Sequence, residues 1–272
     1  VHCCGFDSIP SDMGVWHLQQ ASKEQFGQPC GTIRMRVKAM RGAASGGTVA
    51  SMINITKEAA GNPELRKELS NPYSICPPDH GFKARQNNVT SPELDPESGR
   101  WAGPFIMAGI NTRVVHRSNA LSGNAYGDDF LYDESMLMGK GIKGRLSATG
   151  FVFGLGAFLA GAAIKPTRWV MENYLLPKPG EGPSPEAQEK GFYDLRFYGE
   201  TKDGQKISTR VAGDRDPGYG STAKMLAQAA LSLAFDVDKE EKGGGVWTTA
   251  TVFDQRFIDR LQQNAGLTFT VL

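Results

Sequence analysis

The ten residues Gly5 to Gly14 read GFDSIPSDMG and follow the short apolar run Val1 to Cys4. Four β-compatible residues, then a glycine, carboxylates, hydroxyls and a proline are typical of a buried strand that ends in a polar loop. Ser11 is placed to cap the helix that follows, and Asp12 in its first turn complements the helix dipole. Ligands of open α/β sheets bind at such strand ends, which makes this loop a candidate site. The alternative is an ordinary connection whose polar residues only cap the helix.

The composition excludes several classes of protein. The 272 residues can form one large or two small domains, and 30 basic against 29 acidic residues give no global sign of nucleic-acid binding. Cysteines at positions 3, 4, 30 and 76 show neither metal-ligand spacing nor the density of a disulfide scaffold. Neither a metal constellation nor a signal-peptide pattern is present. We therefore expect free thiols, no metal and a cytoplasmic location.

Alternating apolar residues predict strands. Residues 32–40 place Ile33, Met35, Val37 and Ala39 on one face, and a basic face of Arg34, Arg36 and Lys38 on the other. The alternating runs 192–199 and 205–212 flank Lys202-Asp203-Gly204, which is a strong hairpin signal. Residues 267–272 form a last short strand.

Helical spacing marks further segments. In residues 105–119, Met107, Ile110 and Val114 predict a helix with Arg113 and Arg117 one turn apart on one face. This pair is either a clamp for a phosphate or carboxylate group or a solvated basic face. The acidic, glycine-rich loop 213–222 opens a helix expected to bury Met225, Leu226, Ala229 and Leu233, and residues 253–261 form a helix that Gly266 closes.

Two further segments are rich in glycine or in turn-forming residues, and the first of them leaves alternatives open. The glycine-rich residues 42–48 lead into a helix, whose N-terminus is either an anion site or a tight turn. Residues 61–104 carry many Pro, Asn, Ser and Gly residues, which favours a surface excursion apart from the charged stretch 63–69.

The run Leu146 to Ile164 has no charged residue and is flanked by basic residues on both sides. In order of preference, it predicts buried or dimer-interface helices, a lipid-facing element or a spanning helix. The sequence Gly154-Leu155-Gly156 follows the strand-like residues 151–153, but position 159 is Leu where a dinucleotide fingerprint needs Gly. We therefore reject a Rossmann motif there.

The opening motif resembles a hallmark of the saccharopine dehydrogenase-like oxidoreductases, in the branch that includes the mycobacterial trans-acting enoyl reductases. Residues 104–121, 178–199, 213–224 and 243–272 are similar to that family too, with mild departures at Met13 and Thr249. The resemblance implies an α/β (α+β-like) fold, with a mixed sheet, packed helices and similarity to the second domain of saccharopine reductases. It also implies a Rossmann domain upstream. Residues 1–30 and 243–272 would belong to that dinucleotide-binding domain, and residues 31–242 would form a substrate and dimerisation domain.

By this resemblance, the chain is the substrate-side portion of an NADP- or NAD-dependent oxidoreductase, expected to be a homodimer and inactive by itself. Its substrate would be a small molecule or a lipid or polyketide-like chain. A membrane or lipid surface is a further partner if residues 146–164 are the lipid-facing element, the second alternative given above. The competing hypothesis is a non-catalytic lipid-surface or interaction module with the same fold. The site residues expected are Asp7, Ser8, Asp12 and Tyr219 for catalysis, Asn111, Arg113, Arg117, Asp216 and Lys224 for substrate, and Gly5 and Phe6 for the cofactor. Lone His116 is expected to be structural.

Overall fold

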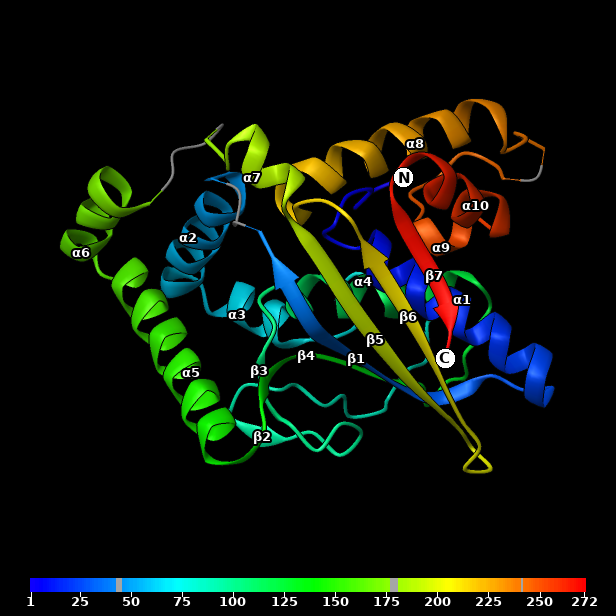
Figure 1. The fold of residues 1–272 in the computed structure, drawn as a ribbon, viewed down its shortest axis with the longest axis horizontal. Helices are drawn as coiled ribbons and strands as arrows, with labels where there is room; N and C mark the ends of the chain where they lie inside the picture. Colours follow the sequence, from blue (N-terminus) through cyan, green and yellow to red (C-terminus); the bar gives the residue numbers. More distant parts are fainter. Residues whose placement is uncertain (43–45, 177–180, 241) are drawn as a thin grey trace.

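The protein is described here by a computed structural model that covers residues 1–272, apart from 43–45, 177–180 and 241 (Figure 1). The part of the chain so described forms an α/β fold, with one seven-stranded mixed sheet and ten α-helices. The strands are β1 (Cys30–Arg41), β2 (Glu93–Leu94), β3 (Trp101–Pro104), β4 (Leu131–Gly139), β5 (Phe192–Thr201), β6 (Lys206–Gly213) and β7 (Leu267–Val271). The helices are α1 (Ile9–Phe26), α2 (Gly46–Gly61), α3 (Pro63–Ser70), α4 (Ala108–Leu121), α5 (Gly141–Ala163), α6 (Lys165–Val170), α7 (Pro185–Glu189), α8 (Thr222–Phe235), α9 (Thr249–Val252) and α10 (Gln255–Asn264), with the π-helical turns η1 (Met171–Leu175) and η2 (Pro217–Ser221).

The strand order is β2-β3-β4-β1-β5-β6-β7, and β1 with β4 is the parallel pair in it. The predicted hairpin is confirmed, since β5 and β6 pair in unbroken register from Tyr193 opposite Gly213 to Glu200 opposite Lys206. Gly204 in its turn has φ of 80°, a conformation that glycine adopts without a steric cost. The predicted C-terminal strand is β7, which extends the same sheet beyond β6.

The core lies between one face of the sheet and the helices α1, α4, α8, α9 and α10. Ile33, Met35 and Val37 of β1 point into it, as the alternation predicted, whereas Ala39, expected on the same face, is exposed. Residues from both ends of the chain, such as Ile9 and Phe257, belong to the same hydrophobic cluster. The terminal segments 1–30 and 243–272 therefore complete this core, and their membership of a Rossmann domain stays a prediction.

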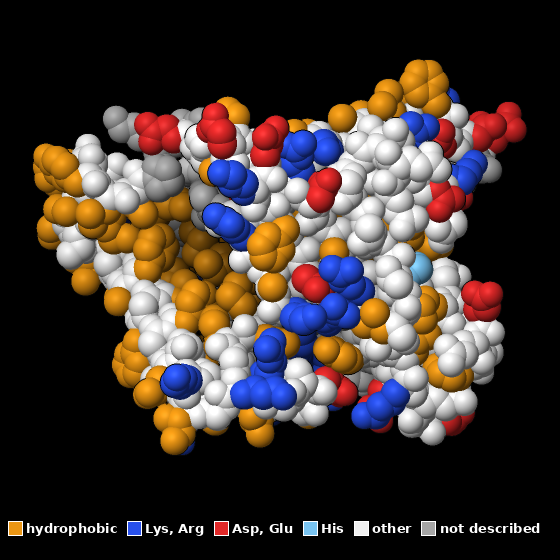
Figure 2. Space-filling view, in the orientation of Figure 1, with side chains coloured by type: hydrophobic (Ala, Val, Ile, Leu, Met, Phe, Trp, Pro, Cys, Tyr) orange, Lys and Arg blue, Asp and Glu red, His pale blue; other side chains and the backbone are white. Residues whose placement is uncertain are grey.

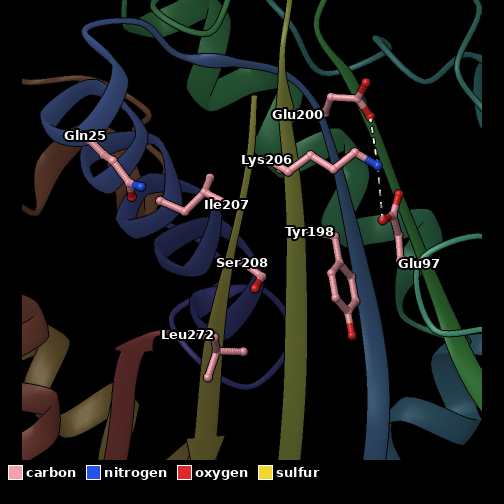
Figure 3. A pocket seen from close by; sticks show the side chains of 9 residues that line it. Gln25, Glu97, Tyr198, Glu200, Lys206, Ile207, Ser208 and Leu272 are labelled. Atoms are coloured by element: carbon pink, nitrogen blue, oxygen red, sulfur yellow. Dashed lines mark ion pairs between the residues drawn. The ribbon is translucent and has the colours of Figure 1, made fainter. Parts of the chain in front are cut away.

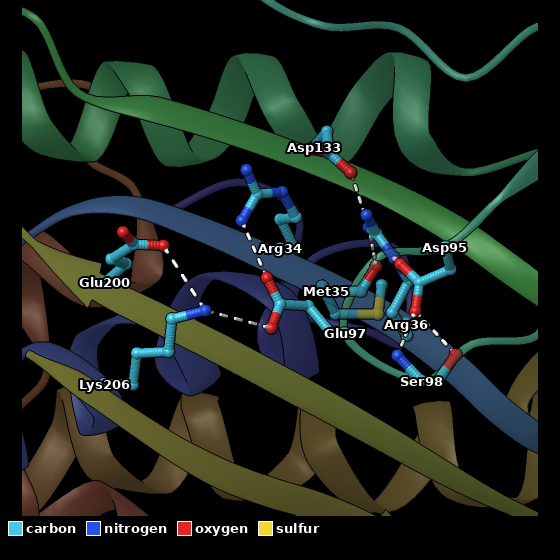
Figure 4. Close-up of polar contacts among 9 residues, drawn as sticks. All are labelled: Arg34, Met35, Arg36, Asp95, Glu97, Ser98, Asp133, Glu200 and Lys206. Atoms are coloured by element: carbon cyan, nitrogen blue, oxygen red, sulfur yellow. Dashed lines mark hydrogen bonds and ion pairs between the residues drawn. The ribbon is translucent and has the colours of Figure 1, made fainter. Parts of the chain in front are cut away.

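The opposite face of β1 differs from the prediction at Arg36. This side chain was expected on a basic outer face, but it is buried, and its Nε donates to Asp95 Oδ1 at 2.5 Å. Its Nη1 also pairs with Asp133 of the neighbouring strand β4 (Figure 4). Residues 93–98 cover this face, so the excursion predicted at 61–104 contributes a buried ion cluster. A buried guanidinium needs such partners, since an unpaired charge in the interior is very costly.

The chain before α1 also differs from the prediction. Val1 to Cys4 form no strand, and α1 begins at Ile9, so that Ser11 lies inside the helix and Ser8 takes the N-cap position. Pro10 explains this start, because a proline in the first helical turn lacks only an N–H that would be unbonded there. Asp12 does lie in the first turn.

The uncharged run is one long helix, α5. By length and composition it is the single helix among the described residues that could cross a membrane, yet only 11% of its most apolar window is buried in the protein. The first-ranked expectation was a buried or dimer-interface helix, and its buried alternative is wrong. A dimer interface, a lipid-facing element and a spanning helix are left open. Phe151, Val152 and Phe153 are helical, which agrees with the rejection of a Rossmann motif.

Two predicted helices expose residues that were expected inside. On α4, Ile110 is 50% exposed, while Asn111, Val114, Val115 and Ser118 are buried. On α8, Leu226 and Leu233 are exposed and Met225, Ala229 and Ser232 are buried. Helix α4 is thus rotated from the orientation that apolar spacing favours, because Asn111 and Ser118 donate hydrogen bonds to the buried carboxyls of Glu134 and Asp12. On α8 the predicted buried face is confirmed at Met225 and Ala229 and is wrong at Leu226 and Leu233. The glycine-rich turn at residues 43–45 lies outside the described part of the chain.

Candidate active site

The loop 5–8 before α1, called the opening loop below, meets two distant segments. Ser8 Oγ donates to Asn111 Oδ1 of α4 at 3.1 Å, and the backbone N–H of Phe6 donates to Thr222 Oγ1 at the start of α8 at 2.9 Å. A Cβ on Gly5 would come within 2.8 Å of Thr222 Cγ2. The glycine therefore permits this close approach. The three segments that the sequence singled out do lie together in the fold.

Beneath the opening loop lies a buried polar group of five residues, which we call the Asn111 cluster. Asn111 Nδ2 donates to Ser11 Oγ at 3.1 Å and to Glu134 Oε2 at 2.9 Å. Tyr132 OH donates to Glu134 Oε1 at 2.7 Å. With Ser8, all of these side chains are buried, so each depends on the others for its hydrogen bonds.

Glu134 is the titratable centre of the Asn111 cluster. Burial raises the pKa of its carboxyl from the usual 4.5 to about 7, although hydrogen bonds from Tyr132, Ser11 and Asn111 lower it. A carboxyl with such a pKa can hold or release a proton near neutral pH. Neither Glu134 nor Tyr132 was predicted from the sequence. The signal was the polar run Asp133 to Ser135 inside an otherwise apolar strand, since such a run in a central strand needs buried partners.

Asp12 connects three helices. Ser118 Oγ of α4 donates to its Oδ1 at 2.6 Å, and Thr249 Oγ1 and the N–H of Ala250 donate to its Oδ2 at 2.7 and 2.8 Å. Burial raises the pKa of this carboxyl to about 6 against the effect of these bonds. Both oxygens of Asp12 are therefore engaged in holding α1, α4 and α9 together. Asp7, by contrast, is exposed on the opening loop.

Arg113 and Arg117 both turn away from the opening loop. The guanidinium of Arg113 donates to the carbonyls of Leu69, Asn71 and Gly109. That of Arg117 donates to the carbonyls of Ile75 and Val246, the latter at 2.8 Å. The two arginines thus fasten residues 69–75, which follow α3, onto α4. Backbone carbonyls occupy the donors that a phosphate or carboxylate clamp would use.

The acidic, glycine-rich loop 213–222 before α8 is held by hydrogen bonds that do not involve the opening loop. Asp216 is buried and its Oδ2 accepts from the N–H of Tyr219 at 2.8 Å. The hydroxyl of Tyr219 donates to the carbonyl of Glu181 at 2.8 Å. Tyr219 therefore points toward the segment before α7 and away from Asp7. Lys224 is half-buried in the first turn of α8.

His116 lies in the aromatic surroundings of Tyr73 and Phe130. Burial lowers the pKa of its imidazole to about 3, so this side chain is neutral at physiological pH. That agrees with the structural role expected for it. No group of three or more His, Cys, Asp or Glu side chains that could hold a metal ion occurs outside the undescribed residues.

A shallow pocket of about 200 Å³ lies apart from these residues, beside the β5–β6 hairpin (Figure 3). Lys206 Nζ lies at its wall, 3.8 Å from Glu200 Oε2 and 3.9 Å from Glu97 Oε2. None of the predicted site residues lines this pocket. We therefore keep the opening loop, with the Asn111 cluster below it, as the candidate active site.

The chain is similar over nearly all of its length to several known proteins. These homologues are called trans-acting enoyl reductases. One from Mycobacterium bovis is 37% identical over 273 residues, which is 95% of this chain and 64% of that protein. One from Mycobacterium ulcerans is 34% identical over 276 residues, 97% of this chain and 65% of that protein. A further Mycobacterium tuberculosis protein, provisionally given the same name, is 37% identical over 274 residues.

The chain thus spans about two thirds of the length of the enoyl reductases it matches. No protein-family model matches it, and no solved structure is significantly similar. Membership of the wider saccharopine dehydrogenase-like family and similarity to a saccharopine reductase domain stay predictions.

Proposed function

We propose that this chain is the substrate-side portion of an enoyl reductase that acts on a lipid or polyketide-like chain. Its similarity to the mycobacterial trans-acting enoyl reductases over nearly all of its length supports the reaction class. The observation that carries the location of the site is the convergence on the opening loop, through the bonds from Ser8 to Asn111 and from Phe6 to Thr222.

Reduction of an enoyl double bond needs a hydride donor, so NADP or NAD is part of the proposal. The described residues do not fit a complete dinucleotide site. Val1 to Cys4 form no strand before the opening loop, and Gly154 to Gly156 lie inside α5. We therefore propose that the cofactor is held by sequence outside this chain, and we assign only Gly5 and Phe6 to a contact with it.

Within this chain, the opening loop would orient the substrate. Saturating a conjugated double bond adds a proton to the α-carbon after hydride has reached the β-carbon. Asp7 is the exposed titratable side chain on the loop and is our candidate proton donor. The Asn111 cluster would act from below as a positioning group, because Ser8 is bonded to a buried amide that cannot move without breaking several hydrogen bonds.

The test uses the complete protein with an enoyl thioester of a long acyl chain and measures oxidation of NADPH. Asp7→Asn should lower turnover about a hundredfold, a typical loss for a general acid, with little change in melting temperature. Asp79→Asn, at another exposed aspartate, is the matched control and should keep full activity. Tyr219→Phe should also keep turnover, because the Tyr219 hydroxyl is bonded to the Glu181 carbonyl.

The second candidate function, a non-catalytic lipid-surface module, is favoured by the exposed apolar helix α5. The absence of NADPH oxidation with every enoyl substrate, together with a degraded glycine fingerprint in the rest of the protein, would establish that alternative.

A further inference from the structure

Helices α5 and α6 and the turn η1 form an exposed apolar surface at one end of the molecule, seen as the orange area on the left of Figure 2. We call it the α5–η1 surface. Phe153 is 75% exposed and Tyr174 is 73% exposed, and contiguous exposed apolar residues of this kind mark interaction surfaces. Its exposed apolar residues are Ile142, Leu146, Phe153, Leu159, Ile164, Trp169, Val170, Tyr174 and Leu175.

The helix α5 is apolar on both sides. Gly144, Ala148 and Ala162 are its buried residues, on the side that packs against β3, β4 and α2. Ile142, Leu146 and Phe153 are exposed on the remainder, and the exposed Ile164 follows the last residue of the helix. An amphipathic surface helix would carry polar residues there, and a helix that is apolar all round is normally covered on every side. The outer face of α5 therefore lacks the covering that its composition requires.

The charge of this region indicates what covers it. Residues 140–171 contain five basic residues and no acidic one. Lys140, Lys143 and Arg145 stand at the start of α5, and Lys165 and Arg168 follow its end. Arg145 lies over the Trp101 ring and Arg168 Nη1 donates to the Ala162 carbonyl, so these two are already engaged within the protein. The three lysines are exposed and stand at the two ends of α5.

Aromatic residues of the interfacial kind extend the same surface. Trp169 and Tyr174 are both exposed, and their rings pack edge to face at 5.7 Å between centroids. Tryptophan and tyrosine are enriched where a membrane meets water, because each has an apolar ring and a polar group. Lysine side chains can lie along such an interface with the ammonium group among the lipid headgroups.

We propose that the α5–η1 surface docks onto an anionic lipid bilayer, with α5 lying in the plane of the interface. The contacts of α5 with β3, β4 and α2 argue against a spanning helix, because insertion would separate it from the sheet. Gly144 packs directly on Gly139, where a Cβ would overlap the backbone, so the start of α5 is held tightly. A two-fold contact between copies would bring together two surfaces that each carry five basic residues and one acidic residue, Glu172, and the excess of like charges opposes this.

Flotation of the complete protein with vesicles tests the proposal, which does not depend on reductase activity. We expect binding to vesicles of phosphatidylcholine with phosphatidylglycerol, and much weaker binding to phosphatidylcholine alone or at high salt. Leu146→Asp with Phe153→Asp should abolish flotation. Changing Lys140, Lys143 and Lys165 together to Ala should weaken it about a hundredfold, since each basic residue near an anionic surface contributes roughly a factor of five.

The matched control carries Leu226→Asp with Phe235→Asp, two exposed apolar positions on α8, and should float like the unchanged protein. Brominated lipids provide a second readout, because they should quench the Trp169 fluorescence of the otherwise unchanged protein. Trp169→Phe, a conservative variant, identifies the quenched component, since it lacks that fluorescence. Absence of flotation, or equal loss in the α8 control, would overturn the proposal. So would a dimer in solution that Leu146→Asp with Phe153→Asp converts to monomer, which would assign the surface to a second copy.

Discussion

Ser8 and Asn111 are 103 residues apart in the chain, yet the Ser8 hydroxyl donates to the Asn111 side chain at 3.1 Å inside the protein. This bond joins the opening loop to α4, and the same Asn111 amide continues to Glu134 on β4. Three elements of different secondary structure therefore share one buried polar group, and the position of the opening loop depends on all of them.

Glu134 should make stability depend on pH. Its pKa is raised from 4.5 to about 7 by burial, so the native state binds the proton more tightly than the unfolded chain does. The free energy of unfolding should therefore fall as pH rises from about 4.5 to 7, and then level off. Glu134→Gln has no carboxyl to titrate. The difference in free energy of unfolding between this variant and the unchanged protein should therefore shift in favour of the variant by on the order of 1–3 kcal/mol from pH 5 to pH 8. Urea unfolding at both pH values measures it. A difference between Glu134→Gln and the unchanged protein that stays constant with pH would contradict the assignment.

Removal of Asp95 should strongly destabilise the fold. Asp95→Asn leaves the buried Arg36 with a weakened partner set, and breaking one side of a buried ion pair costs roughly 3–5 kcal/mol. Glu97→Gln is the matched control, because its partner Arg34 is partly exposed and such pairs contribute about 1 kcal/mol or less. Chemical unfolding of the two variants compares them. Equal losses of unfolding free energy in the two variants would mean that the buried pair of Arg36 with Asp95 contributes no more to stability than the partly exposed pair of Arg34 with Glu97.

Arg113→Lys should lower the melting temperature and leave the KM for substrate unchanged. A lysine cannot reproduce the separate bonds from the guanidinium to the carbonyls of Leu69 and Asn71, so residues 69–75 should loosen from α4. Melting curves and steady-state kinetics on the complete protein are measured together. A higher KM at unchanged stability would instead restore the arginine clamp that the sequence predicted.

Gly14→Ala should destabilise the protein although it replaces a glycine inside a helix. A Cβ at this position of α1 would overlap the ring of Phe197 on β5, and such overpacking typically costs about 1–3 kcal/mol. Gly150→Ala on α5 meets no atom within 4 Å and should be neutral or stabilising by up to about 1 kcal/mol. Thermal unfolding tells the two apart, and a stabilised Gly14→Ala would show that Phe197 can move aside.

Much of the fold was predictable because it rests on local chemistry. The β5–β6 hairpin follows from two alternating runs and an Asp-Gly turn, and α4 and α8 begin within a few residues of the predicted positions. The start of α1 was misplaced because Pro10 and Ser11 both suit a helix start, and only the backbone path shows which residue is first. The site was predictable in part, since the opening loop, α4 and the loop before α8 do meet.

The amino-acid sequence by itself determined β1, the β5–β6 hairpin, β7 and the helices α4, α8 and α10, since those depend on spacings of two, three or four residues and on turn chemistry. It did not determine β4, and the strand expected at residues 1–4 does not form. Only the tertiary structure decided which polar groups are buried. Arg36 became a core residue because residues 93–98 cover it. Glu134 acquired its raised pKa because the fold buries its carboxyl, although the hydrogen bonds from Asn111 and Tyr132 lower that pKa. Helix α5 shows the opposite behaviour, because its outer side chains are apolar and yet no other segment of the described chain covers them. In each case the environment of a side chain is set by segments far away in the chain, and no local pattern contains that information.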